Sequence, residues 1–177
     1  MAHTRQNGKP FGFDYLDFGQ IVVAYLRDSG NSRDMAVDAS AGIQYAYTPP
    51  NGFDTLIFRL AGHIVDNQQM NADGFGGGAA LSSGCRLILN GPDGNETRDL
   101  LDNTTIQTNG DFDTFFTTNA LLSSRGLGFQ WASSAPVVLP RLRNGTAIVW
   151  ENQDSLTGLE HFEIALHGML VETSFDD

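Results

Sequence analysis

Apolar and polar residues alternate with a period of two over most of the chain from residue 41 onward. The run I-Q-Y-A-Y-T ends at the turn signal P-P-N-G, and a long alternating segment follows at residues 53–66. This alternation predicts half-buried strands, because successive side chains of a strand point to opposite faces of a sheet. Further strands are expected at residues 85–90, 96–101, 104–106, 111–118, 127–133, 137–139, 145–151 and 160–173.

Two of these segments read almost alike. Residues 58–66 are F-R-L-A-G-H-I-V-D and residues 162–172 are F-E-I-A-L-H-G-M-L-V-E. The two-residue offset, and the lack of another matching pair, argue against an internal repeat. We expect two neighbouring strands, with Phe58 on the inner face and with Arg59 opposite Glu163 on the outer face. Such an exposed pair contributes only ~0.2–1 kcal/mol, and both residues are candidates for subunit contacts.

The number of short strands and the absence of a long amphipathic helix pattern predict an all-β fold. We expect a two-sheet antiparallel sandwich of the jelly-roll type at residues 41–177. Residues 1–40 form a predicted N-terminal arm or peripheral element, in which residues 21–26 suit either a strand or a short helix. The arm's aromatic residues either cover the domain or dock on a neighbouring subunit, and these interface candidates are Phe11, Phe13, Tyr15 and Phe18.

The net charge limits the expected binding partners, and the cysteine content limits the expected disulfide bonds. The net charge of −11 opposes binding to nucleic acid and to anionic membranes, so neither is expected as a partner. The single cysteine, Cys85, excludes an internal disulfide and lies in the apolar run C-R-L-I-L, where we expect it to be a buried hydrophobic residue. No signal peptide and no apolar run of membrane-spanning length are visible.

One set of residues resembles a metal-ligand set. His161, Glu163 and His167 share one face of the last predicted strand, and two histidines with a carboxylate are typical of iron and zinc sites. Residues two apart on a strand are ~6.5–7 Å apart, so they share a metal only if another element supplies a ligand. His63 could supply it if the two look-alike strands are adjacent. We expect no catalytic residues and no bound metal, with His161, Glu163, His167 and His63 as the candidate ligands if a metal is bound.

Calcium is the other ion to consider. The loops at residues 66–73 and 93–103 are rich in Asp and Asn, whose oxygens suit calcium as a structural ion. Gln69, Asn71, Asp73 and Gly74 are similar to the start of an EF-hand loop, but the pattern fails because Ala80 stands where that motif requires Glu. No cofactor is therefore expected, with structural calcium as the alternative.

The segment N-Q-D-S-L-T-G-L-E-H-F-E-I-A-L-H-G-M-L-V-E resembles the C-terminal strands of small virion proteins of tailed bacteriophages. The stretches N-A-D-G-F-G-G-G-A-A-L and N-G-D-F are similar to the same group, and the likeness covers residues 53–172. The resemblance implies a non-enzymatic structural subunit, made in the host cytoplasm and incorporated into the virion. Its implied partners are other copies of itself and virion proteins such as the major capsid protein.

Within this interpretation we favour a capsid decoration (cement) protein, with a head–tail connector or tail component as the alternative. A carbohydrate-binding sandwich is a further alternative, with Trp131, Trp150, Tyr45 and Tyr47 as stacking candidates that equally suit core positions. A cupin-like metalloprotein that uses the histidines and Glu163 is the last alternative.

Overall fold

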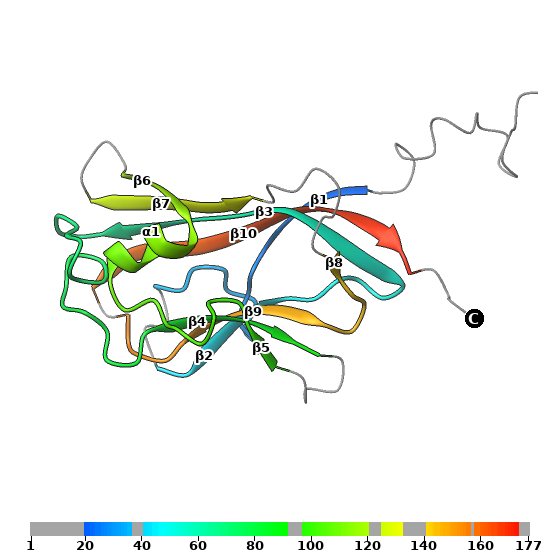
Figure 1. Cartoon of the computed structure of the whole chain (residues 1–177), viewed down its shortest axis with the longest axis horizontal. Coiled ribbons are helices and arrows are strands. Elements are labelled where there is room, and N and C mark those ends of the chain that lie inside the picture. Colours follow the sequence, from blue (N-terminus) through cyan, green and yellow to red (C-terminus); the bar gives the residue numbers. More distant parts are fainter. Residues whose placement is uncertain are drawn as a thin grey trace, which may run out of the picture.

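Two antiparallel sheets face each other in the computed structural model, which describes residues 20–36, 41–91, 97–120, 125–132, 141–156 and 158–173. Figure 1 shows the sheets as two layers, with β3, β10 and β7 in one and β2, β9, β4 and β5 in the other. The predicted all-β, two-sheet antiparallel sandwich is confirmed. Its jelly-roll connectivity stays a prediction.

The larger sheet has six strands among the residues that the structure describes. Five follow the order β1-β10-β3-β7-β6, and β8 pairs with one end of β3. Their bounds are β1 Gln20–Tyr25, β3 Phe53–Asp66, β6 Thr117–Ala120, β7 Gly126–Ala132, β8 Arg141–Leu142 and β10 Leu159–Glu172.

The smaller sheet, in the described part of the chain, has four strands in the order β2-β9-β4-β5. Their bounds are β2 Ile43–Tyr47, β4 Cys85–Asn90, β5 Thr97–Asp99 and β9 Ala147–Asn152. β4 and β5, which lie within the predicted strands 85–90 and 96–101, pair antiparallel with each other. β9 lies between β2 and β4, and its side chains Ile148, Val149 and Trp150 are all buried.

The two look-alike segments are the two longest strands, β3 and β10, and they are adjacent as predicted. The expected Arg59–Glu163 pair is wrong. The strands are antiparallel, so the start of one look-alike segment lies beside the end of the other. Arg59 therefore pairs with His167, and Glu163 pairs with His63.

A bulge in β3 overturns the predicted inward position of Phe58. The register passes from Arg59–His167 directly to Ile57–Gly168, which leaves Phe58 as the additional residue. The inward alternation of Leu60 and Ile64 is therefore continued by Ile57, which is buried, whereas Phe58 is only partly buried.

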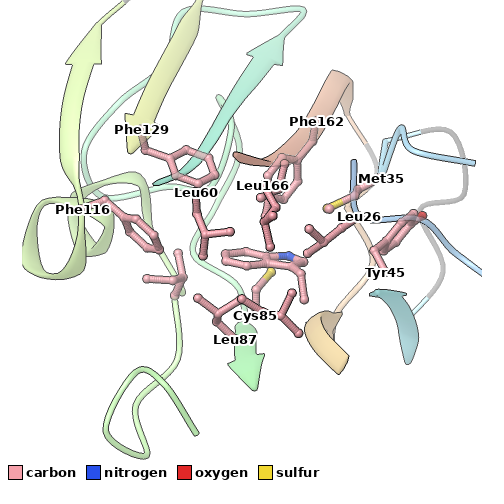
Figure 2. Close-up of a cluster of buried hydrophobic side chains, with 14 of the residues drawn as sticks. Leu26, Met35, Tyr45, Leu60, Cys85, Leu87, Phe116, Phe129, Phe162 and Leu166 are labelled. Carbon is pink, nitrogen blue, oxygen red and sulfur yellow. The ribbon is translucent and has the colours of Figure 1, made fainter. Parts of the chain in front are cut away.

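The core lies between the sheets and is rich in aromatic side chains. Trp150 of β9 is fully buried and meets Phe162 of β10 edge-on, with ring centroids 5.4 Å apart. Figure 2 shows Phe129, Leu60, Phe162 and Leu166 on one side of this core and Leu87 and Cys85 on the other. Burial of each large apolar side chain contributes ~1.5–3 kcal/mol, so these contacts hold the two sheets together.

Residues 111–118 do not form the predicted strand. A 3-10 turn at Asn109–Asp111 leads into the short helix α1, Phe112–Phe115, and β6 begins only at Thr117. The Asp111 carboxylate accepts hydrogen bonds from the backbone N–H groups of Gln107 and Thr108, both at 2.8 Å, and so favours a turn. The turn places Phe112 and Phe116 side by side in the core.

Part of the segment assigned to an arm or peripheral element is an edge strand of the larger sheet. β1 pairs with β10, and the chain after it contributes Leu26 and Met35, both fully buried, to the core. The aromatic interface candidates Phe11, Phe13, Tyr15 and Phe18 lie outside the described residues.

Candidate functional site

The outer face of the larger sheet carries polar groups at one end and apolar groups at the other. On β10 the outward residues are His161, Glu163, Ala165, His167 and Met169, which alternate with the buried residues Phe162, Ile164, Leu166 and Leu170. The prediction that His161, Glu163 and His167 share one face is therefore confirmed.

His63, His161 and Glu163 come together at the polar end, and we call these three residues the histidine–glutamate cluster. One donor atom from each lies within 4.8 Å of those of the other two. His161 Nε2 is 3.5 Å from Glu163 Oε2, and His63 Nδ1 is 3.8 Å from Glu163 Oε1. The side chains of His63, His161 and Glu163 are 38%, 28% and 14% exposed, so the cluster lies at the surface but is only partly solvated.

Two further residues reach the cluster from the segment that follows β1. Asp34 Oδ2 lies 2.7 Å from His161 Nδ1, and its Oδ1 accepts hydrogen bonds from the backbone N–H groups of Phe162 and Ala36. Arg33 Nε is 3.3 Å from Glu163 Oε2, and the guanidinium lies 4.4 Å from the centre of the Tyr25 ring. Sequence reasoning missed both residues, because they are about 130 positions away from β10 in a segment that it assigned to an arm.

Electrostatics favour an ionised Asp34 and a neutral His63. Burial acts to raise the pKa of Asp34, but the hydrogen bonds from Phe162, Ala36 and His161 outweigh it and lower that pKa below its ordinary value. Partial burial, and then the charge of a protonated His161, lower the pKa of His63 against the opposing effect of Glu163 and Asp34. An ionised carboxylate only accepts hydrogen bonds, so Asp34 accepts the proton on His161 Nδ1, and Nε2 is the ring nitrogen that faces Glu163.

His167 does not belong to the cluster. It lies four residues further along β10 and pairs with Arg59, whose Nη2 is 3.1 Å from His167 Nε2. Partial burial and the neighbouring guanidinium lower the pKa of His167. A donor on Arg59 therefore meets a neutral imidazole acceptor, and the metal set predicted from β10 alone loses one of its members.

Cys85 is fully buried, as predicted. Burial raises the pKa of its thiol far above the ordinary value, and Asp154 raises it further. Its Sγ lies 3.7 Å from Asn152 Oδ1, which also accepts a hydrogen bond from Trp150 Nε1 at 2.9 Å. A thiol in this environment is a packing group, because nucleophilic cysteines need an accessible thiolate.

Protein groups organise the loop that the sequence offered as a calcium site. Asp66 accepts hydrogen bonds from the backbone N–H groups of Gln68 and Gly77. The Asn109 amide donates to the carbonyl oxygens of Asn71 and Gly76, both at 2.7 Å. Calcium binding here stays a prediction, and these hydrogen bonds give the loop a defined shape without an ion.

An apolar pocket of about 460 Å³ opens between the sheets near α1, and its lining includes Trp131, Phe115 and Leu87.

Three of the four proposed stacking residues are core residues, since Trp150 and Tyr45 are fully buried and Tyr47 nearly so. Tyr47 moreover shares a 2.9 Å hydrogen bond with Thr55. An exposed aromatic platform for sugars is thus not formed by these three.

Comparisons with protein families, with curated proteins and with solved structures found no match for this chain. The resemblance to tailed-phage virion proteins therefore rests on the quoted residues alone. Within the described part of the chain, no helix has the length and apolar character needed to cross a membrane.

Proposed function

We propose that this protein is a non-enzymatic structural subunit that associates with other copies of itself through β1. The supporting observation is the exposure of two large apolar residues on this edge strand. Ile21 is 69% exposed and Val23 is 56% exposed, and of the described large hydrophobic residues only Leu100 is also exposed. Grouped exposed apolar residues mark interaction sites in soluble proteins more often than scattered ones do.

These two residues belong to a larger apolar area, the β1 patch, defined as Ile21, Val23, Leu56 and Met169. Ile21 pairs with Met169, which pairs in turn with Leu56 on β3, so all three side chains lie on one face. Val23 lies two residues further along β1, pairs with His167, and points to the same face. The patch is therefore continuous across three strands and ends at the edge of the sheet.

A second copy of the chain is the occupant that fits this patch. β1 is the terminal strand of the described sheet, and an edge strand presents N–H and C=O groups that pair readily with another strand. Pairing of two β1 strands would bring Ile21 and Val23 of both copies together and remove their exposed apolar surface from water.

The assembly that we propose is a tailed-phage virion, with the subunit in the position of a capsid decoration protein. The resemblance of residues 53–172 supports this part, and the sandwich fold suits a subunit used in many copies. A head–tail connector or tail component is the alternative, in which heterologous contacts close a ring.

The change that tests self-association is the double substitution Ile21→Thr and Val23→Thr. Threonine keeps the β-branched shape that strands favour, so the fold is retained while the apolar contact is lost. Wild-type protein is expected to be oligomeric by sedimentation velocity, and the double variant is expected to sediment as a monomer. Leu100→Thr, which alters the third exposed apolar residue, serves as the control and should leave the oligomer intact.

A monomeric wild-type protein at all accessible concentrations would overturn self-association through β1. The virion assignment is tested separately by quantitative mass spectrometry of purified particles from an infected host. A copy number on the scale of the shell subunits indicates a decoration protein, whereas the copy number of a single ring indicates a connector or tail component. Absence of the chain from the particles contradicts the virion assignment.

A further inference from the structure

We propose that the histidine–glutamate cluster is a zinc site, in which His63, His161 and Glu163 provide three ligands and water completes the coordination. This inference is independent of the proposed function. It depends on the convergence of side chains from β3 and β10, because β10 brings only two of the ligands together and His63 of β3, which pairs with Glu163, supplies the third.

The distances suit zinc. Bonds of ~2.0–2.2 Å in a tetrahedral arrangement separate the ligand atoms by ~3.3–3.5 Å. His161 Nε2 lies 3.5 Å from Glu163 Oε2, and His63 Nδ1 lies 3.8 Å from the other carboxylate oxygen, Oε1. One ligand atom from each residue lies within 4.8 Å of the other two, so side-chain rotations bring the three atoms to the tetrahedral spacing. Imidazole nitrogens with one carboxylate oxygen form a typical zinc ligand set, and the partial exposure leaves room for a water ligand.

Asp34 strengthens the assignment independently of the three ligands. Metal-binding histidines usually donate their second ring N–H to a carboxylate, which fixes the tautomer and the ring orientation. Asp34 makes this contact with His161 Nδ1 at 2.7 Å, and it is itself held by the backbone of Phe162 and Ala36. His161 is therefore already oriented with Nε2 toward the proposed ion.

Glu163 supplies the negative charge of the site. Its Oε2 is buried and accepts no hydrogen bond from the described residues, although Arg33 Nε lies 3.3 Å away. Arg33 is half-exposed, so its guanidinium is free to move outward along the Tyr25 ring when a divalent cation takes its place. Arg33 is thus a competing cation, and its removal should favour zinc.

The test is isothermal titration of zinc into protein freed of metal by a chelator, with Co²⁺ absorption as a second reading of coordination geometry. One equivalent is expected to bind the wild-type protein, and the Co²⁺ form should show the visible bands of a tetrahedral site. Glu163→Gln and His63→Asn should abolish this binding, and Asp34→Asn should weaken it by ~10–100-fold. Arg33→Gln should tighten it, which a purely structural role of the cluster would not produce.

His167→Ala is the matched control, because it removes an imidazole from the same face of the same strand outside the cluster. It should bind zinc as the wild type does. Circular dichroism of each variant establishes that the fold is retained. Absence of stoichiometric binding to the wild-type protein would overturn the proposal, as would binding that survives both Glu163→Gln and His63→Asn.

Discussion

At the scale of single residues, His167 shows how a neighbour determines a protonation state. Its Nε2 lies 3.1 Å from Arg59 on β3, and Val23 flanks it on β1, so the only charged group paired across the sheet with this imidazole is a cation. Burial and this cation lower the pKa of His167 in the folded state. The unfolded state therefore binds the proton more readily than the folded state does.

The sign of the resulting pH dependence follows from linkage. The stability contributed by neutral His167 is fully present above the unfolded pKa of about 6.5 and is lost as pH falls through the lowered folded pKa. We expect His167→Gln, which keeps a polar group beside Arg59, to lose less stability than the wild type between about pH 8 and 5. Urea unfolding of both proteins across this pH range measures the difference in their unfolding free energies. The contributions of the other histidines are the same in both proteins and cancel in this difference. Parallel pH profiles would contradict the assigned cause.

Residue-scale features were predictable only where they depend on local pattern. The burial of Cys85 and the shared face of His161 and Glu163 follow from the alternation of their own strands. The contact between Asp34 and His161 spans 127 positions and depends on how the chain after β1 crosses the end of β10. No periodicity in the sequence encodes that crossing.

At the scale of elements, the close approach of β3 to its neighbours depends on Gly62. A Cβ atom at this position would lie 2.4 Å from the ring of Phe129 and 2.6 Å from the backbone oxygen of Glu163. Gly62→Ala is therefore expected to cost ~1–3 kcal/mol of unfolding free energy, since a well-packed core accepts an added methyl group only with strain. Denaturant unfolding at neutral pH measures this cost.

Gly128 is the control for this prediction, because it lies on β7 directly opposite His63 in the same sheet. A Cβ there meets only the Asn119 oxygen at 3.4 Å, an ordinary contact. Gly128→Ala should therefore change stability by less than ~0.5 kcal/mol. Equal effects of the two substitutions would show that strand propensity, and not the contact with Phe129, sets the cost.

Strand positions were easier to predict than register. The period of two located β3 and β10, and the likeness of the two segments suggested that they are neighbours. It could not locate the bulge at Phe58, which shifts the alternation by one residue and places Ile57 in the core. The pattern D-F-D-T-F-F likewise suits a strand or a turn, and the hydrogen bonds of Asp111 decide in favour of the turn.

At the scale of the whole molecule, the two sheets account for the stability of one chain, while the self-association that we propose through the β1 patch would add the stability of an assembly. A partner that binds only the folded state stabilises it by mass action. If two copies associate through β1, a 100-fold rise in concentration adds ~2.7 kcal/mol per dimer, or ~1.4 kcal/mol per chain. For a domain of this size, that free energy raises the unfolding temperature by ~3–5 °C.

We therefore expect the unfolding temperature of the wild-type protein to rise with its concentration, and that of the Ile21→Thr, Val23→Thr variant to stay constant. Differential scanning calorimetry over a 100-fold range measures both. The variant changes only side chains that are more than half exposed, so its unfolding temperature at high dilution should be close to that of the wild type. An equal concentration dependence in both proteins would place the self-contact elsewhere. An unfolding temperature that is independent of concentration in both proteins would show that the chain is a monomer, and the β1 patch would then bind a partner other than a second copy.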